Sequence, residues 1–146
     1  MKDKIKNLLM LTILTALSSY QTMVKADNSP PQSLGAALSA TDLFQVTCAL
    51  GASNVYAAVS DSGGTNRLNL QIYKSLKALS TTDNTAVGTL SPAITLIGTT
   101  GAGIYYIMVN KNVATAINYS FVYHCQTAAG GHLPAGGTAL GNVQNQ

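Results

Sequence analysis

Residues 117–125, INYSFVYHC, decide the fold class of this chain. Aromatic and apolar side chains recur there at every second position: Tyr119, Phe121, Tyr123 and Cys125. A period of two is typical of a β-strand with one buried face, because successive side chains of a strand point to opposite sides of its sheet. The segment therefore predicts a strand whose core-facing side includes Cys125.

A second strand of this kind is predicted at the start of the same domain, in residues 41–50 (TDLFQVTCAL). Its apolar face is expected to carry Phe44, Val46, Cys48 and Leu50. Cys48 and Cys125 are the only cysteines, and an even number in an exported chain favours a disulfide. Such a bridge would tie the first strong strand to the last and contribute about 4 kcal/mol in the chain-entropy model. Two free buried thiols or bridges between chains are the alternatives.

Further strands are predicted between these two. Apolar side chains alternate, or are continuous, in residues 54–60, 67–74, 90–97 and 104–110. Turn-forming sequences separate the strands, and residues 75–88 are predicted to be polar and turn-like. Since no long helical period is present, the pattern predicts an all-β fold. The expected architecture is an antiparallel, jelly-roll-like β-sandwich of six to eight short strands with one disulfide.

Two segments flank this predicted domain of residues 41–126. Residues 27–40 (DNSPPQSLGAALSA) predict an extended or loose lead-in. Residues 127–146 contain many Gly and Ala and few large apolar side chains, which predicts a flexible tail. An assembly arm, or a strand donated to a neighbour, is the alternative for this tail.

The first 26 residues have the pattern of a secretory signal peptide. Three lysines precede an apolar core at residues 8–17 (LLMLTILTAL), and a polar stretch follows that ends in Val24-Lys25-Ala26, a small-residue cleavage pattern. This core is about half as long as a membrane-spanning helix. The sequence predicts cleavage near Ala26, no membrane span afterwards, and a secreted, periplasmic or cell-surface protein. A buried amphipathic helix of a cytosolic protein is the alternative.

The basic character of the chain lies in this leader. The chain has a formal net charge of +3, whereas residues 27–146 contain equal numbers of basic and acidic side chains and no Glu. Without a Lys/Arg cluster to contact phosphates, the sequence argues against nucleic-acid binding. A neutral, charge-poor surface instead favours contact with a protein or glycan surface, or with another copy of the same chain.

Four segments occur in an order that is characteristic of one family: residues 42–46 (DLFQV), 68–73 (LNLQIY), 101–110 (GAGIYYIMVN) and 118–122 (NYSFV). Together they resemble the bacterial pre-peptidase C-terminal domain. The resemblance implies an exported, non-catalytic β-sandwich that accompanies secreted peptidases or other exported enzymes. Some relatives bind calcium through acidic residues, whereas the matching strand here carries Arg67 and Asn69.

No catalytic constellation is evident. His124 is predicted to be a surface or edge-strand residue, and His132, in the tail, is not expected to meet it. Asp42, Asp61 and Asp83 are widely spaced in the sequence, and calcium needs about six to eight oxygen ligands. Serine and glycosidase chemistry lack their partner residues. The sequence thus predicts no metal, no cofactor and no enzymatic activity.

Tyrosines are the best candidates for a contact surface. The residues singled out are Tyr56, Tyr73, Tyr105 and Tyr106. Exposed tyrosines commonly hold sugars or partner proteins, although core or rim positions are the alternative. Adjacent residues of a strand point to opposite faces, so one of Tyr105 and Tyr106 should point inward. The sequence predicts a secreted, non-enzymatic binding or structural module that self-associates. An accessory or carbohydrate-binding partner of a secreted hydrolase is the alternative.

Overall fold

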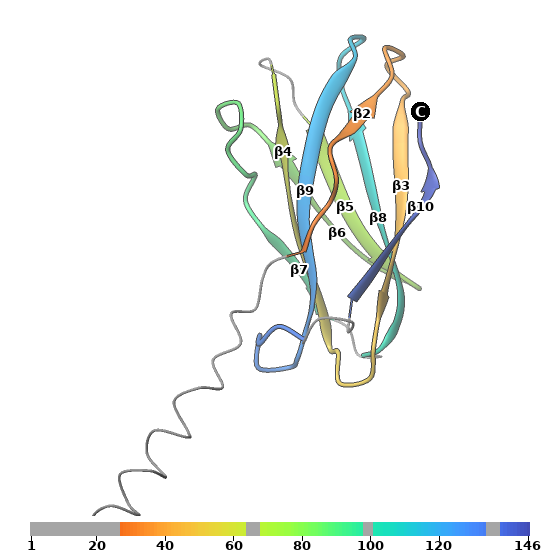
Figure 1. Ribbon diagram of the computed structural model, residues 1–146, viewed down its shortest axis with the longest axis vertical. Helices are drawn as coiled ribbons and strands as arrows, with labels where there is room; N and C mark the ends of the chain where they lie inside the picture. The colour runs from red at the N-terminus through yellow and green to blue at the C-terminus, as the bar shows by residue number, and fades with distance from the viewer. Residues whose placement is uncertain (1–26, 64–67, 98–100, 134–137) are drawn as a thin grey trace, which may run out of the picture.

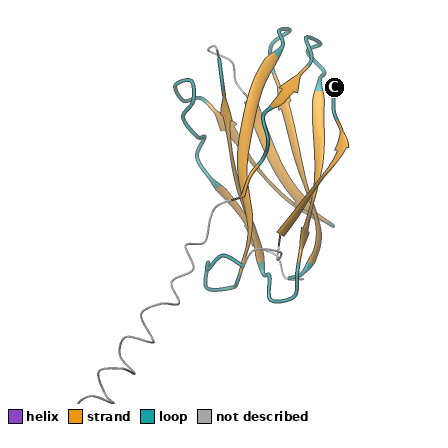
Figure 2. Ribbon diagram, in the orientation of Figure 1, coloured by secondary structure: helices purple, strands orange, loops and turns teal. Residues whose placement is uncertain are grey.

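The computed structural model describes residues 27–63, 68–97, 101–133 and 138–146. All regular secondary structure in these ranges is β-structure, arranged as two antiparallel sheets that pack face to face (Figures 1 and 2). Within them, no helix is long and apolar enough to cross a membrane. The predicted signal peptide, residues 1–26, lies outside the described residues.

The described residues form ten strands, five in each sheet. The first sheet contains β1 (Asp27–Asn28), β2 (Gln32–Leu34), β4 (Asn54–Asp61), β7 (Ile94–Ile97) and β9 (Ile117–Gln126). The second sheet contains β3 (Thr41–Cys48), β5 (Leu68–Lys74), β6 (Lys77–Asp83), β8 (Gly103–Lys111) and β10 (Thr138–Gln144). The first sheet has the order β1-β9-β4-β7, with β2 also on β9, and the second has the order β10-β3-β8-β5-β6.

The core lies between the two sheets and is built by alternation along each strand. In β3 and β8, every second side chain points inward and is buried, as the period of two predicts. The largest fully buried side chains are Tyr105, Tyr119, Phe44, Phe121, Leu34, Leu68, Leu70 and Ile72. Phe44 and Phe121 come from opposite sheets, and their ring centroids are 4.8 Å apart. The sandwich predicted from the sequence is thus confirmed.

The disulfide between Cys48 and Cys125 crosses this core. Cys48 ends β3 in the second sheet and Cys125 lies in β9 of the first, with their Cα atoms 5.7 Å apart. The bridge therefore joins the two layers of the sandwich and closes a sequence separation of 77 residues. The predicted pairing is confirmed, and its geometry is that of a bond between facing strands.

The structure corrects the predicted strands at two places. Residues 75–88 were expected to be polar and turn-like, but they contain β6, which pairs with β5 along its whole length. Because β6 is an edge strand with mostly exposed side chains, it lacks an alternating apolar pattern. Leu50 was expected on the buried face of the first strand, but it is 91% exposed because β3 ends at Cys48.

The two flanking segments are also more ordered than the sequence predicted. The lead-in supplies β1 and β2, which pair with β9, and the Ser29 hydroxyl accepts a hydrogen bond from the Phe121 amide at 2.9 Å. In the tail, β10 pairs with β3, from Thr138 opposite Cys48 to Gln144 opposite Leu43. The prediction of a flexible tail is therefore wrong for residues 138–144.

Candidate functional site

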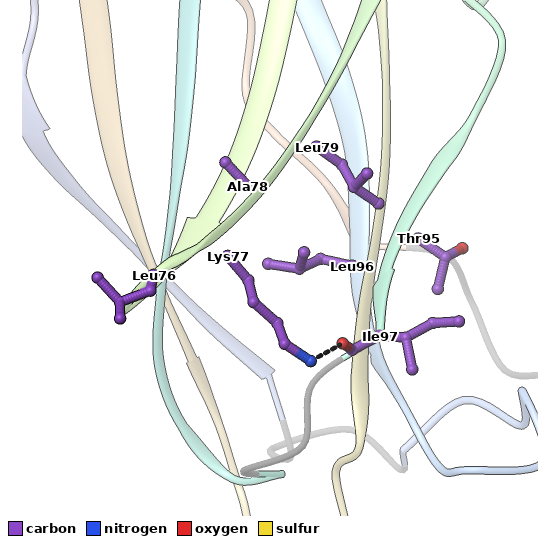
Figure 3. Close-up of a pocket in the computed structure, with 7 residues that line it drawn as sticks. All are labelled: Leu76, Lys77, Ala78, Leu79, Thr95, Leu96 and Ile97. Carbon is purple, nitrogen blue, oxygen red and sulfur yellow. Dashed lines mark hydrogen bonds between the residues drawn. The ribbon is translucent and has the colours of Figure 1, made fainter.

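Two strand edges meet on one side of the sandwich and leave a shallow groove between them (Figure 3). β6 ends the second sheet and β7 ends the first, so each is paired within its sheet along one edge only. The groove has a volume of about 350 Å³. Its lining residues are Leu76, Lys77, Ala78, Leu79, Thr95, Leu96 and Ile97.

Most of the groove surface is apolar and open to water. Leu96 is buried at its floor, while Leu79 and Ile97 on the two walls are 43% and 69% exposed. Leu76, in the turn between β5 and β6, is fully exposed. Leucine and isoleucine side chains from both sheets thus line the groove, with Leu76 and Ile97 on opposite sides of Lys77 (Figure 3). We call it the β6–β7 groove.

Two side chains of β6 donate hydrogen bonds to backbone carbonyl oxygens of β7 and of the segment just before it. The Lys77 ammonium donates a long hydrogen bond of 3.5 Å to the carbonyl oxygen of Ile97, drawn as the dashed line in Figure 3. The Thr81 hydroxyl donates to the carbonyl oxygen of Pro92 at 2.8 Å. Among the described residues that line the groove, Lys77 is the one with a charged side chain. The surface therefore suits an apolar occupant better than a charged one.

The four tyrosines singled out in the sequence do not form one surface. Tyr73 and Tyr106 are directly opposite each other on β5 and β8, on the outer side of the second sheet. Their rings stack with centroids 5.1 Å apart and planes 18° apart, and both residues are half-buried. Gln45 of β3 lies opposite Tyr106 on its other side. Tyr56 belongs to β4 in the other sheet.

Tyr105 is a core residue, so its predicted role as a surface contact is wrong. Its side chain is fully buried, and its hydroxyl donates to the Gly101 carbonyl oxygen at 2.8 Å. The Lys74 ammonium lies 4.2 Å from the centre of its ring. Burial raises the pKa of Tyr105. As expected for adjacent strand residues, Tyr105 points inward and Tyr106 points outward.

His124 and His132 form a stack with Tyr56, against both predictions made for these histidines. The ring centroids of Tyr56 and His124 are 4.4 Å apart, and those of His124 and His132 are 3.5 Å apart. His124 is buried because β9 is a central strand and the segment around His132 folds back over it. This reversal includes Gly130 at φ +81°, so the adjacent glycines were the sequence signal that could have revealed it.

The imidazole ring of His124, in the middle of this stack, is neutral at pH 7. Burial, and then the neighbouring His132, lower the pKa of His124 to about 4. The Gln126 side-chain amide lies within hydrogen-bonding distance of His124 Nε2, at 2.9 Å. Among the described residues, no group of three or more His, Cys, Asp or Glu side chains could hold a metal ion.

Three acidic residues that are distant in the sequence are all buried at one end of the core. Asp42 accepts hydrogen bonds from the Tyr119 hydroxyl at 2.6 Å and the Gln146 amide at 2.8 Å. Asp61 lies opposite Tyr119 in the β4–β9 pairing, and its amide donates to Asp83 Oδ2 at 3.2 Å. The sequence spacing gave no sign that Asp61 and Asp83 would lie next to each other.

No family model and no curated protein matches this chain. One solved structure to which it is similar is the crystal structure of Yersinia pseudotuberculosis-derived mitogen (YPM), at 9% sequence identity and a TM-score of 0.45. The match covers 79% of this chain and 96% of the mitogen chain. A likeness this weak says nothing about what this protein binds. The resemblance to the pre-peptidase C-terminal domain stays a prediction.

Proposed function

We propose that this chain is a secreted, non-enzymatic binding and structural module that associates with a second copy of itself through the β6–β7 groove. One observation carries this proposal. Exposed apolar side chains from both sheets gather where β6 and β7 each lack a neighbour on one side. Patches of this kind on small soluble domains commonly mark interaction sites.

Both the unpaired strand edges and the exposed apolar side chains of the groove favour association. An edge strand presents unpaired N–H and C=O groups, which form hydrogen bonds with another strand. Fully burying a Leu or Ile side chain contributes roughly 1.5–3 kcal/mol. Leu76, Leu79 and Ile97 are all available for such burial. In a two-fold contact, each copy contributes the same patch, so the apolar area removed from water doubles.

Charge favours a second copy over a charged partner. Residues 27–146 contain equal numbers of basic and acidic side chains, so two copies do not repel each other through net charge. Within the groove, Lys77 is already bonded to a carbonyl oxygen. An identical, mostly apolar surface is therefore a suitable partner for the groove.

The proposed place of action is outside the cytoplasm, after removal of the leader near Ala26. The leader has the charge and apolar pattern of an export signal. The Cys48–Cys125 disulfide is of the kind that persists in oxidising compartments. Mass spectrometry of protein from the extracellular and periplasmic fractions should find a mature N-terminus at or close to Asp27.

Self-association is tested by light scattering of residues 27–146 over a range of concentrations. We expect the average mass to rise with concentration, and the double variant Leu76→Lys, Ile97→Lys to remain monomeric. Leu50→Lys is the matched control, because Leu50 is 91% exposed but does not line the groove. A wild-type protein that stays monomeric at the highest concentration, or a control that dissociates equally, would contradict the proposal.

The stacked tyrosines support a second candidate, a carbohydrate-binding or accessory partner of a secreted hydrolase. Tyr73 and Tyr106 offer adjacent half-exposed rings, and Gln45 beside them can bond sugar hydroxyls. In affinity electrophoresis through polysaccharide gels, Tyr106→Ala should abolish any retardation. Tyr56→Ala, on the other sheet, should preserve it. Equal mobility of wild type and Tyr106→Ala on every polysaccharide would rule this candidate out.

A further inference from the structure

We propose that a hollow on the outer face of the second sheet, beside Tyr73, binds one neutral pyranose ring of a glycan. The site rests on the carbohydrate-binding candidate function and adds to it a place, a ligand class and the residues that select the ligand. The hollow lies over β5 and β6 and has a volume of about 340 Å³, near the lower end of small-ligand sites. Its lining residues are Gln71, Ala78, Leu79 and Ser80.

The pairing of β5 with β6 places Tyr73 next to this hollow. Tyr73 is directly opposite Ala78, and Gln71 is directly opposite Ser80. Side chains that are directly opposite point to the same face of a sheet, with Cβ atoms about 5 Å apart. Tyr73 and Gln71, two residues apart on β5, share the outer face. Because Ala78 carries only a methyl group, the space beside the tyrosine ring stays open.

One face of the Tyr73 ring is available to a ligand. The Tyr106 ring, on β8, stacks on the other face, with the two centroids 5.1 Å apart and the planes 18° apart. Since β5 lies between β8 and β6, the uncovered face is directed towards β6 and the hollow. An aromatic face offers apolar contact area to a flat ligand. The C–H groups on one side of a pyranose ring form a flat apolar surface of this kind.

Gln71 and Ser80 supply the polar contacts that a sugar needs. Neither side chain has a hydrogen-bond partner among the described residues. The neighbouring row on the same face differs, because Asn69 donates to Asn110 Oδ1 at 3.0 Å and accepts from the Thr82 hydroxyl at 2.9 Å. An amide and a hydroxyl can both donate and accept, as the hydroxyls of a sugar do. An aromatic side chain in the hollow would leave both groups unpaired.

The lack of charge on this face favours a neutral ligand. Of the described side chains that point outward from β3, β5, β6 and β8, none is charged. The Lys74 ammonium is bonded to the carbonyl oxygens of Gly101 and Ala102, and that of Lys77 to the Ile97 carbonyl oxygen in the β6–β7 groove. The carboxylate of an acidic sugar would lose water here without gaining a cationic partner.

The test is an NMR titration of ¹⁵N-labelled residues 27–146 with the methyl β-glycosides of glucose, galactose, mannose and N-acetylglucosamine, and with glucuronate. An open hollow that holds one ring predicts a Kd on the order of 10⁻³ M. We expect the amide resonances of Gln71, Ala78 and Ser80 to shift with at least one neutral glycoside. Glucuronate should leave them in place.

Substitutions in the hollow should weaken this binding. Ala78→Leu fills the space beside the Tyr73 ring and should raise the Kd roughly tenfold or more. Ala37→Leu is the matched control, because Ala37 is exposed between β2 and β3 and does not line the hollow. Gln71→Ala and Ser80→Ala should each raise the Kd about fivefold, the effect of losing one hydrogen bond. Tyr73→Phe should bind as the wild type does, since the ring face makes the contact.

Self-association is separated from this measurement by a monomeric variant. Ala78 and Leu79 line both the hollow and the β6–β7 groove, so a second copy in the groove would hinder access to the hollow. The titration is therefore repeated with the double variant Leu76→Lys, Ile97→Lys. Binding to this variant supports the hollow whether or not the wild type self-associates.

Three results would overturn the proposal. They are unshifted amides with all four glycosides at about 50 mM, well above the expected Kd, equal affinity in Ala78→Leu and Ala37→Leu, and equal binding of glucuronate. Polysaccharide gels separate the hollow from the broader candidate function. If Tyr106→Ala abolishes retardation and Ala78→Leu preserves it, carbohydrate binding stands but the hollow is not its site.

Discussion

His124 couples the stability of the fold to pH. Its pKa is about 4 in the folded protein and near 6.5 in an unfolded chain. Between these values the unfolded chain binds a proton that the folded protein excludes. The stabilisation is therefore complete above pH 6.5 and is lost as the pH falls towards 4. The rings stacked around His124 belong to Tyr56 and His132, and neither offers a carboxylate to hold a proton there.

We expect the free energy of unfolding to fall by about 3 kcal/mol between pH 7 and pH 4 through His124 alone. Urea unfolding, followed by circular dichroism at several pH values, measures this change in the free energy of unfolding. His124→Phe should remove this part of the pH dependence. His132→Phe should keep most of it, because burial is the main cause of the lowered pKa. An identical pH profile for wild type and His124→Phe would contradict this account.

At the level of single residues, the sequence predicts which side chains are buried but not which distant residues contact each other. The face that each core residue occupies follows from alternation, which correctly placed Phe44, Val46 and the two cysteines. Contacts between distant segments do not follow from it. Asp61 and Asp83 meet because two strands from different sheets end side by side, which no local pattern encodes.

Among the elements, β10 depends on few side chains for its position. Leu140 packs against the core, whereas Val143 is 53% exposed. Leu140→Ala should therefore lower the free energy of unfolding by about 1–2 kcal/mol, less than for a fully buried leucine. Val143→Ala should change it by less than about 0.5 kcal/mol. Equal effects in urea unfolding would show that β10 does not pack on β3 as described.

The central strands could be predicted from the sequence, whereas the edge strands β6 and β10 could not. β3, β5, β8 and β9 have neighbours on both sides and one face in the core, so their sequences alternate. Strands β6 and β10 lie at sheet edges, where exposed side chains carry no apolar pattern. The β6–β7 groove is built from such edges. For this reason the tyrosines were identified as candidates from the sequence, and the groove was not.

For the whole molecule, the disulfide is the main constraint on the unfolded chain. Closing a loop with a sequence separation of 77 should stabilise the fold by about 4 kcal/mol. We expect Cys48→Ala, Cys125→Ala to lose stability of this order in urea unfolding, and the reduced wild type to behave similarly. A loss below about 1 kcal/mol would mean that the bridge restricts the unfolded ensemble little.

The same bridge also decides how the protein responds to a mechanical load. It closes residues 48–125 into a covalent ring that contains β4 to β8 and nearly all of β9. The lead-in, most of β3 and β10 are arms outside this ring. A pull on the two chain ends passes from Cys48 to Cys125 through the sulfur atoms. Tension can peel the arms away, but it cannot lengthen the ring, which contains both walls of the β6–β7 groove. Copies joined through that groove would keep their contact surface intact under shear.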